Sequence, residues 1–204
     1  MLRELGCTVI PLSLLVDYLL GRRADLPPKA VVITADDGHI TQFTEMRPVL
    51  ERARLPVTLF IYPSAISYAA YAMTWDQLRQ LHADPLVEVA GHTYWHPNFK
   101  HERKQQTPAD YAKFVHMQLV KSKAVLEQRL GAIRPYLAWP FGIYDQELMD
   151  AAAAAGYEAA FTLDAKFATR ALPMQAQPRY LMVDSVSEAM LERLLKRNMN
   201  RSST

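Results

Sequence analysis

The chain has 204 residues, half of them hydrophobic and 22% charged, so we expect one globular domain, residues 1–204, with a sizeable core. Its net charge of +2 excludes a protein that binds nucleic acid through bulk charge. The single cysteine, Cys7, excludes an internal disulfide framework and a cysteine-based zinc ribbon.

The most apolar N-terminal stretch, residues 8–20, is too short and too polar to cross a membrane. Pro11 and Asp17 interrupt it, and a transmembrane helix needs about 20 consecutive apolar residues. The stretch also lacks the positively charged flank and the cleavage site of a signal peptide. We therefore expect no transmembrane segment and interpret residues 8–10 as a strand that leads into an amphipathic helix.

Short apolar runs alternate with helical patterns along the rest of the chain. The runs are rich in Val, Ile, Tyr and Phe and mostly continuous, which is typical of strands covered on both faces. The predicted strands cover residues 31–34, 57–62, 87–90, 136–139, 159–163 and 180–183, and the predicted helices cover residues 41–54, 74–82, 108–130, 145–155 and 186–198. This alternation predicts an α/β fold with a parallel sheet and outer helices, either doubly wound or a barrel. In both architectures the chemistry belongs at the carboxyl ends of the strands.

Two adjacent carboxylates follow the first of these strands. Residues 34–39 read TADDGH, so Asp36 and Asp37 precede Gly38, which permits a tight turn. Because unpaired buried charge is costly, two carboxylates at the end of a buried strand indicate a functional site. The alternative is a helix N-cap, a position that favours Asp.

Two histidines, His92 and His96, follow the strand over 87–90. Their spacing of four would place both rings on one face of a helical turn, close enough to share a metal, although two histidines can also fall in a loop by chance. Combined with one carboxylate they would form an open three-ligand site of the zinc type, and the second carboxylate would be free to act as a base. The same ligand set also suits a non-haem iron oxygenase, but the strand–helix alternation argues against that class.

At this point the motifs resemble those of a known family. Residues 31–38 (VVITADDG) are similar to the first motif of the polysaccharide deacetylases, the NodB-homology domain of carbohydrate esterase family 4, which usually reads T-F-D-D-G. Residues 92–96 (HTYWH) match the second motif, and residues 139–142 (WPFG) resemble the third. Residues 156–161 (GYEAAF) are also typical. The WPFG variant is most similar to the group that acts on poly-N-acetylglucosamine.

The resemblance implies a distorted (β/α) barrel, with an incomplete barrel as the alternative if the N-terminus is truncated. It also implies a metal-dependent N- or O-deacetylase. By motif position, Asp37, His92 and His96 would hold the metal, which is zinc in the first instance, with cobalt or nickel as alternatives. Asp36 would be the general base, and the backbone N–H of Phe141 would help to stabilise the oxyanion.

The sequence departs from the family pattern in two places that matter for catalysis. Ala138 stands where many relatives carry an arginine that orients the base, and Arg179 is the candidate to replace it; the alternative for Arg179 is a surface cation. The late histidine that serves as general acid is absent, because no histidine follows His116. We expect His39 to take this role, with a solvent-facing residue as the alternative.

Aromatic residues flank the motifs and are candidates to bind the sugar. They are Trp139, Tyr94, Trp95 and Tyr144, and core packing is the alternative for each. Taken together, the sequence predicts a metal-dependent hydrolase that removes acetyl groups from an N-acetylated polysaccharide such as poly-N-acetylglucosamine or chitin. The alternative is a degenerate member that binds sugar or metal without efficient catalysis. The resemblance implies an envelope, periplasmic or extracellular location, and the lack of a visible signal peptide leaves the cytoplasm as the alternative.

Overall fold

The computed structural model describes residues 1–199. Five parallel strands form one sheet in the order β3-β4-β5-β6-β7, and two further strands, β1 and β2, pair separately. The strands are β1 (Thr8–Val9), β2 (Ala30–Val31), β3 (Thr34–Asp36), β4 (Val57–Ile61), β5 (Val87–Gly91), β6 (Tyr136–Ala138) and β7 (Ala159–Phe161). The large sheet is curled into a half-barrel with β3 and β7 at its edges. The predicted α/β class with a parallel sheet is confirmed.

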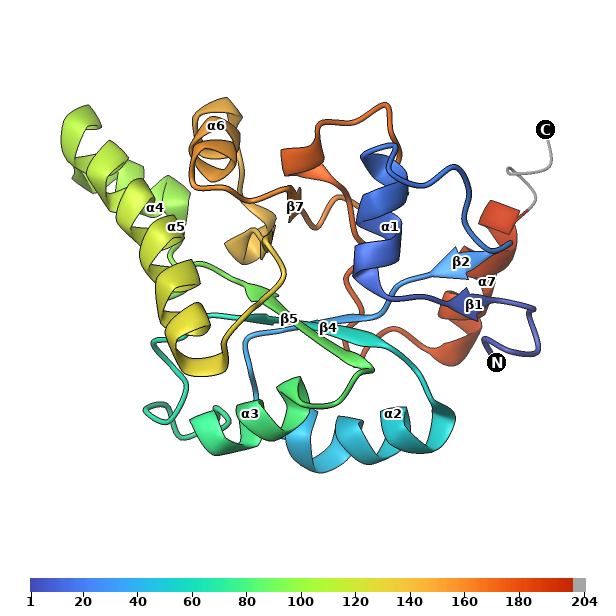
Figure 1. Cartoon of the computed structure of the whole chain (residues 1–204). Coiled ribbons are helices and arrows are strands. Elements are labelled where there is room, and N and C mark those ends of the chain that lie inside the picture. Colours follow the sequence, from blue (N-terminus) through green and yellow to red (C-terminus); the bar gives the residue numbers. More distant parts are fainter. Residues whose placement is uncertain (200–204) are drawn as a thin grey trace.

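Helices surround this sheet on several sides (Figure 1). The α-helices are α1 (Leu12–Leu19), α2 (Arg47–Ala53), α3 (Trp75–His82), α4 (Phe99–Gln105), α5 (Pro108–Leu130), α6 (Gln146–Ala154) and α7 (Glu188–Met199). A π-helical turn, η1 (Gln42–Met46), leads into α2. Two 3₁₀ turns are η2 (Pro140–Gly142) and η3 (Met174–Ala176). Within residues 1–199, no helix is long and apolar enough to cross a membrane.

The central strands are covered on both faces, which explains their continuous apolar sequence. All five residues of β4 are buried. Leu59 and Ile61 pack in the core cluster formed with α2 and α3, while Phe60 between them packs with Leu12 and Val16 of α1. Because side chains alternate along the strand, its residues pack into two separate core clusters, one on each face.

A buried carboxylate ties α1 to the sheet. Glu88 of β5 is 8% exposed, and its Oε2 accepts hydrogen bonds from the backbone N–H of Ser13 and from the hydroxyl of Thr58, each at 3.1 Å. Its Oε1 lies 3.0 Å from Nε of Arg134. The first turn of α1 therefore has one of its unpaired N–H groups satisfied by a strand residue rather than by its own N-cap.

Two of the predicted elements are wrong. The apolar run 180–183 is not a strand, and Leu181, Met182 and Val183 are about half exposed. The segment before it joins the sheet edge through a bridge between Gln177 and Phe161. The predicted strand 31–34 divides into β2 and β3, which belong to different sheets. A run of apolar residues forms a strand only where a neighbouring strand pairs with its backbone.

Candidate metal centre

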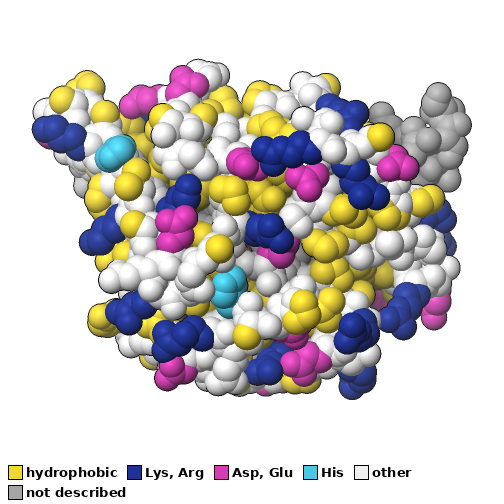
Figure 2. Space-filling view, viewed as in Figure 1, with side chains coloured by type: hydrophobic (Ala, Val, Ile, Leu, Met, Phe, Trp, Pro, Cys, Tyr) yellow, Lys and Arg dark blue, Asp and Glu magenta, His cyan; other side chains and the backbone are white. Residues whose placement is uncertain are grey.

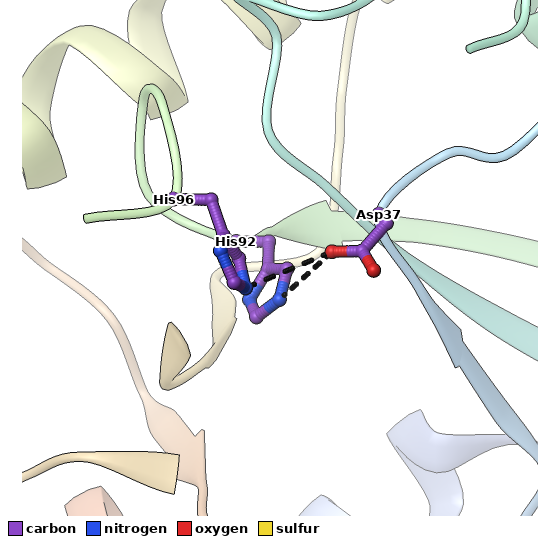
Figure 3. Close-up of side chains that lie close together, drawn as sticks. All are labelled: Asp37, His92 and His96. Carbon is purple, nitrogen blue, oxygen red and sulfur yellow. Dashed lines mark ion pairs between the residues drawn. The ribbon is translucent and has the colours of Figure 1, made fainter. Parts of the chain in front are cut away.

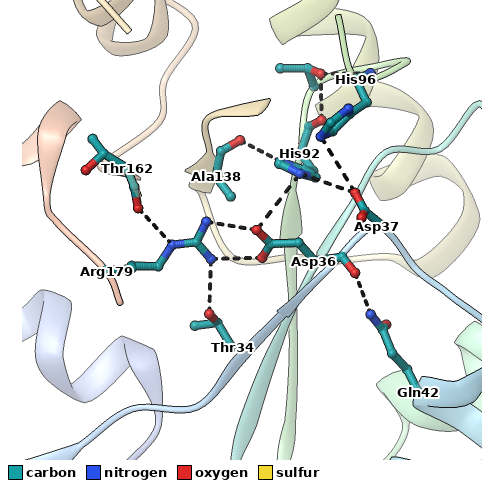
Figure 4. Close-up of polar contacts among 10 residues, drawn as sticks. Thr34, Asp36, Asp37, Gln42, His92, His96, Ala138, Thr162 and Arg179 are labelled. Carbon is teal, nitrogen blue, oxygen red and sulfur yellow. Dashed lines mark hydrogen bonds and ion pairs between the residues drawn. The ribbon is translucent and has the colours of Figure 1, made fainter. Parts of the chain in front are cut away.

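The two adjacent carboxylates lie at the carboxyl end of β3, on a turn whose backbone separates them. Asp37 (φ 78°) and Gly38 (φ 76°) both adopt the left-handed conformation. This conformation suits Gly and is tolerated by Asp. At Gly38 a Cβ would also lie only 2.8 Å from Cδ1 of Ile66. The result is that Asp36 and Asp37 point in different directions (Figure 4).

His92 and His96 reach the site from a loop, not from the helical turn that their spacing suggested. The loop follows β5, and Thr93 (φ 63°) and His96 (φ 60°) are left-handed. The hydroxyl of Thr93 accepts from the N–H of His96 at 3.2 Å, and the side chain of Gln118 on α5 accepts from the N–H groups of residues 94 and 95. These bonds replace helical hydrogen bonds and bring the two rings together, 4.6 Å apart between centroids.

Asp37, His92 and His96 converge in the geometry of a metal site (Figure 3). One ligand atom from each lies within 4.8 Å of the others. Oδ1 of Asp37 is 3.5 Å from Nε2 of His92 and 3.7 Å from Nε2 of His96, and it is buried without a hydrogen-bond partner. Nδ1 of His92 lies 2.7 Å from the carbonyl of Ala138, so Nδ1 donates to this carbonyl and Nε2 faces Asp37. A carboxylate and two imidazoles around an unpaired oxygen fit a divalent metal such as zinc.

The electrostatics favour the protonation states that a metal requires. Contact with His92 lowers the pKa of Asp37 more than its partial burial raises it. Burial lowers the pKa of His96, and repulsion from His92 adds to this effect. An ionised carboxylate and a neutral imidazole are the ligand forms of these side chains.

Asp36 points away from this cluster toward Arg179 (Figure 4). The guanidinium donates one 2.8 Å hydrogen bond to each carboxylate oxygen, and it also donates to the hydroxyl of Thr34 and the carbonyl of Thr162. Arg179 therefore connects the two edges of the half-barrel, near β3 and β7. Burial raises the pKa of Asp36, but the charge and hydrogen bonds of Arg179 outweigh it and hold the pKa below its usual range. Oδ2 of Asp36 remains 4.0 Å from Nε2 of His92.

The sequence model of the polysaccharide deacetylases matches residues 23–160. The chain belongs to the polysaccharide deacetylase family. It is 24% identical to the poly-beta-1,6-N-acetyl-D-glucosamine N-deacetylase of Escherichia coli K12, over 91% of this chain and 32% of that protein. It is 22% identical to the enzyme of the same name from Staphylococcus aureus MRSA252, over 84% of this chain and 61% of that protein. The chain thus spans about a third and about three fifths of these relatives.

The chain has the fold of several solved structures. IcaB from Ammonifex degensii superposes with a TM-score of 0.79 at 23% identity, covering 96% of this chain and 84% of that one. The deacetylase PplD of Streptococcus pyogenes, in complex with acetate, superposes with a TM-score of 0.79 at 20% identity, covering 95% and 82%. These likenesses confirm the half-barrel of the polysaccharide deacetylase fold.

In this deacetylase-family chain the last three residues of the WPFG segment form the turn η2 beside the candidate metal centre. Phe141 is left-handed (φ 56°), and its exposed ring lies 4.5 Å from that of His96, between centroids. The prediction that Trp139 binds sugar is wrong: the side chain is fully buried, packs edge-on against Phe99, and donates its indole N–H to the carbonyl of Gln175. A ring enclosed in the core has no face left for a ligand.

The other aromatic candidates have varied surroundings. The hydroxyl of Tyr144 donates to Asp164, and the ring of Tyr94 is covered by the ammonium group of Lys121 at 4.0 Å. Trp95 is 42% exposed. His39 is exposed and stacks on Tyr71.

Sequence reasoning missed two residues near the centre. Tyr62, one residue past β4, packs its ring against His92 and His96 at 6.3 and 5.4 Å between centroids. Gln42 is buried and donates from Nε2 to the backbone carbonyl of Asp36 at 2.5 Å. Tyr62 could have been found as the residue at a strand's carboxyl end, whereas Gln42 follows no motif and reaches the turn only because η1 folds back beneath it.

Proposed function

We propose that this chain removes acetyl groups from an N-acetylated polysaccharide, with poly-N-acetylglucosamine as the first substrate to consider and a chitin-like polymer as the second. The observation that carries the proposal is the unpaired, buried Oδ1 of Asp37, which faces two histidine nitrogens while a second carboxylate stands beside it. Membership in the family and the names of the Escherichia coli and Staphylococcus aureus relatives support the substrate.

In this proposal Asp37, His92 and His96 hold the metal, with zinc first and cobalt or nickel as alternatives. A bound divalent ion would lower the pKa of a water molecule and polarise the acetyl carbonyl. The carbonyl of Ala138 fixes the ring of His92 through Nδ1, so that Nε2 is directed at the metal position. The chain itself thus orients the ring of His92.

Asp36 is the proposed base that accepts the proton of the attacking water. Its carboxylate is ionised at neutral pH because Arg179 holds its pKa low. The paired guanidinium reduces the basicity of Asp36 but fixes its position, and a fixed base contributes more than a mobile one. Arg179 is therefore a positioning residue, and it takes the role of the arginine that many relatives carry at the position of Ala138.

The remaining steps need an oxyanion donor and a proton donor. The left-handed backbone of Phe141 carries the N–H that we propose for the oxyanion, and one such donor contributes on the order of 3 kcal/mol to transition-state stabilisation. His39, which the sequence suggested as the proton donor, has its Nδ1 engaged by Thr41 at 2.9 Å and its ring stacked on Tyr71. This placement favours a binding role over proton transfer.

The proposal is tested by acetate release from β-1,6- and β-1,4-linked N-acetylglucosamine oligomers, using protein stripped with a chelator and reloaded with zinc, cobalt or nickel. We expect release to require metal and to fall about 10²- to 10⁴-fold in Asp36→Asn. His101→Ala, at an exposed histidine on α4, is the matched control and should keep its activity. Metal binding without acetate release from any oligomer would overturn the proposal. The chain would then be a degenerate family member that binds metal or sugar without catalysis, the alternative that the missing late histidine suggests.

A further inference from the structure

We propose that His39 and Tyr71 form a stacking platform for a sugar ring of the glycan, immediately beside the metal centre. The two rings are nearly parallel, with an interplanar angle of 14° and centroids 5.9 Å apart. His39 is exposed and Tyr71 is 43% exposed. Flat aromatic surfaces with polar edges are the usual partners of ligands that combine apolar faces with hydroxyl groups, as sugar rings do. The inference rests on the proposed function and names a binding site for its substrate.

The backbone holds the two rings in place. The residues before and after them pair in antiparallel fashion: the N–H of Ile40 donates to the carbonyl of Tyr71 at 2.8 Å, and the N–H of Met73 donates to the carbonyl of Gly38 at 2.9 Å. His39 and Ala72 form the bridge between these bonds. The platform is therefore built onto the same turn that carries Asp37, and it needs little ordering when a ligand binds.

The platform is continuous with the metal centre. The hydroxyl of Tyr71 contacts the hydroxyl of Tyr62, and the ring of Tyr62 packs on His96. His39 follows Asp37 by two residues, so their Cα atoms are no more than about 7.6 Å apart. The loop from β4 to α3, which carries Tyr71, projects beyond the sheet (Figure 1). One sugar unit of a chain whose acetyl group reaches the metal would thus meet this surface.

The hydrogen bonding of His39 suits a binding residue. Its Nδ1 accepts from the backbone N–H of Thr41 at 3.2 Å, so the ring's N–H is on Nε2. An imidazole N–H is a suitable donor to a hydroxyl or acetyl oxygen of a sugar. The face shown in Figure 2 mixes basic, acidic and apolar side chains without a concentration of one sign.

The test compares Tyr71→Ala and His39→Ala with the unaltered zinc-loaded protein. Two substrates are used: an N-acetylglucosamine pentamer, which would span the platform, and 4-nitrophenyl acetate, which requires only the metal centre. We expect KM for the pentamer to rise about tenfold with little change in kcat, so that the pentamer-to-ester ratio of kcat/KM falls about tenfold. Tyr71→Phe, which keeps the ring, should retain most of the affinity, and Tyr68→Ala, at a tyrosine that is 83% exposed on the same loop, should match the unaltered protein.

Two outcomes would overturn the platform. One is a pentamer KM that is the same in both alanine variants as in the unaltered protein. The other is a fall in kcat with constant KM in His39→Ala, which would return His39 to the role of proton donor. If the unaltered protein releases no acetate from any substrate, the proposed function fails, and calorimetric titration with the pentamer still decides the platform: weaker binding in Tyr71→Ala supports it, and equal or absent binding in both proteins refutes it.

Discussion

Replacing Arg179 with alanine removes the only side chain seen, among the described residues, to hydrogen-bond the carboxylate of Asp36. The side chains are 12% exposed for Arg179 and 26% exposed for Asp36, so water replaces the lost donors only in part. The hydroxyl of Thr34 and the carbonyl of Thr162 also lose a partner. The variant therefore leaves a mostly buried negative charge without its counter-ion.

The structure sets the expected size of this effect. Removing one partner of a buried ion pair costs about 3–5 kcal/mol, and the residual exposure of Asp36 puts the value at the lower end. We expect the free energy of unfolding of the metal-free protein to fall by about 3 kcal/mol at pH 7. Arg179→Lys should recover only part of it, because an ammonium group cannot form both parallel hydrogen bonds.

The assay is urea unfolding followed by circular dichroism in the presence of a chelator, with Arg52→Ala on the exposed side of α2 as the control. The control should stay within about 0.5 kcal/mol of the unaltered protein. Arg179→Ala is also measured in the Asp36→Asn background, where its cost should drop by about 2 kcal/mol since no charge is left unpaired. A cost below about 1 kcal/mol, or an equal cost in both backgrounds, would refute the ion-pair argument.

Two further predictions concern the stability of the site's surroundings. Gly142→Ala would bring a Cβ within 2.8 Å of Cβ and 3.0 Å of the backbone nitrogen of Leu163, so we expect a steric cost in addition to that of the positive φ. It should destabilise the fold by about 1–3 kcal/mol more than Gly21→Ala, where φ is also positive (75°) but nothing lies within 4 Å of the added Cβ; equal losses in thermal unfolding would contradict this. Glu88→Ala leaves the buried hydroxyl of Thr58 without its acceptor and should lower the free energy of unfolding by about 3 kcal/mol. Glu88→Gln keeps an acceptor oxygen and should lower it clearly less in the same urea titration.

The strand pattern was readable from the sequence where burial was uniform. The runs at β4 and β5 are apolar because helices cover both faces of these strands, so the local sequence indicates their burial directly. The run at 180–183 is equally apolar but has no neighbouring strand to pair with, so it stays exposed. Helix α4 is absent from the helices predicted from the sequence, yet Asn98 caps it by accepting from the N–H of His101. A pairing strand lies far away in the sequence and a capping side chain is polar, so a hydrophobic pattern indicates neither of them.

The sequence by itself determined the chemical groups of the site and their approximate place, because adjacent carboxylates and a histidine pair at strand ends have few structural uses. Tertiary structure alone decided how they are arranged. The left-handed turn at Asp37 and Gly38 divides the two carboxylates between the histidines and Arg179, and that arginine is 143 residues away from Asp36 in the chain. Likewise, the fold buried Trp139 and left Tyr71 at the surface. Side-chain direction and long-range pairing depend on backbone conformation and closure of the half-barrel, which no local pattern encodes.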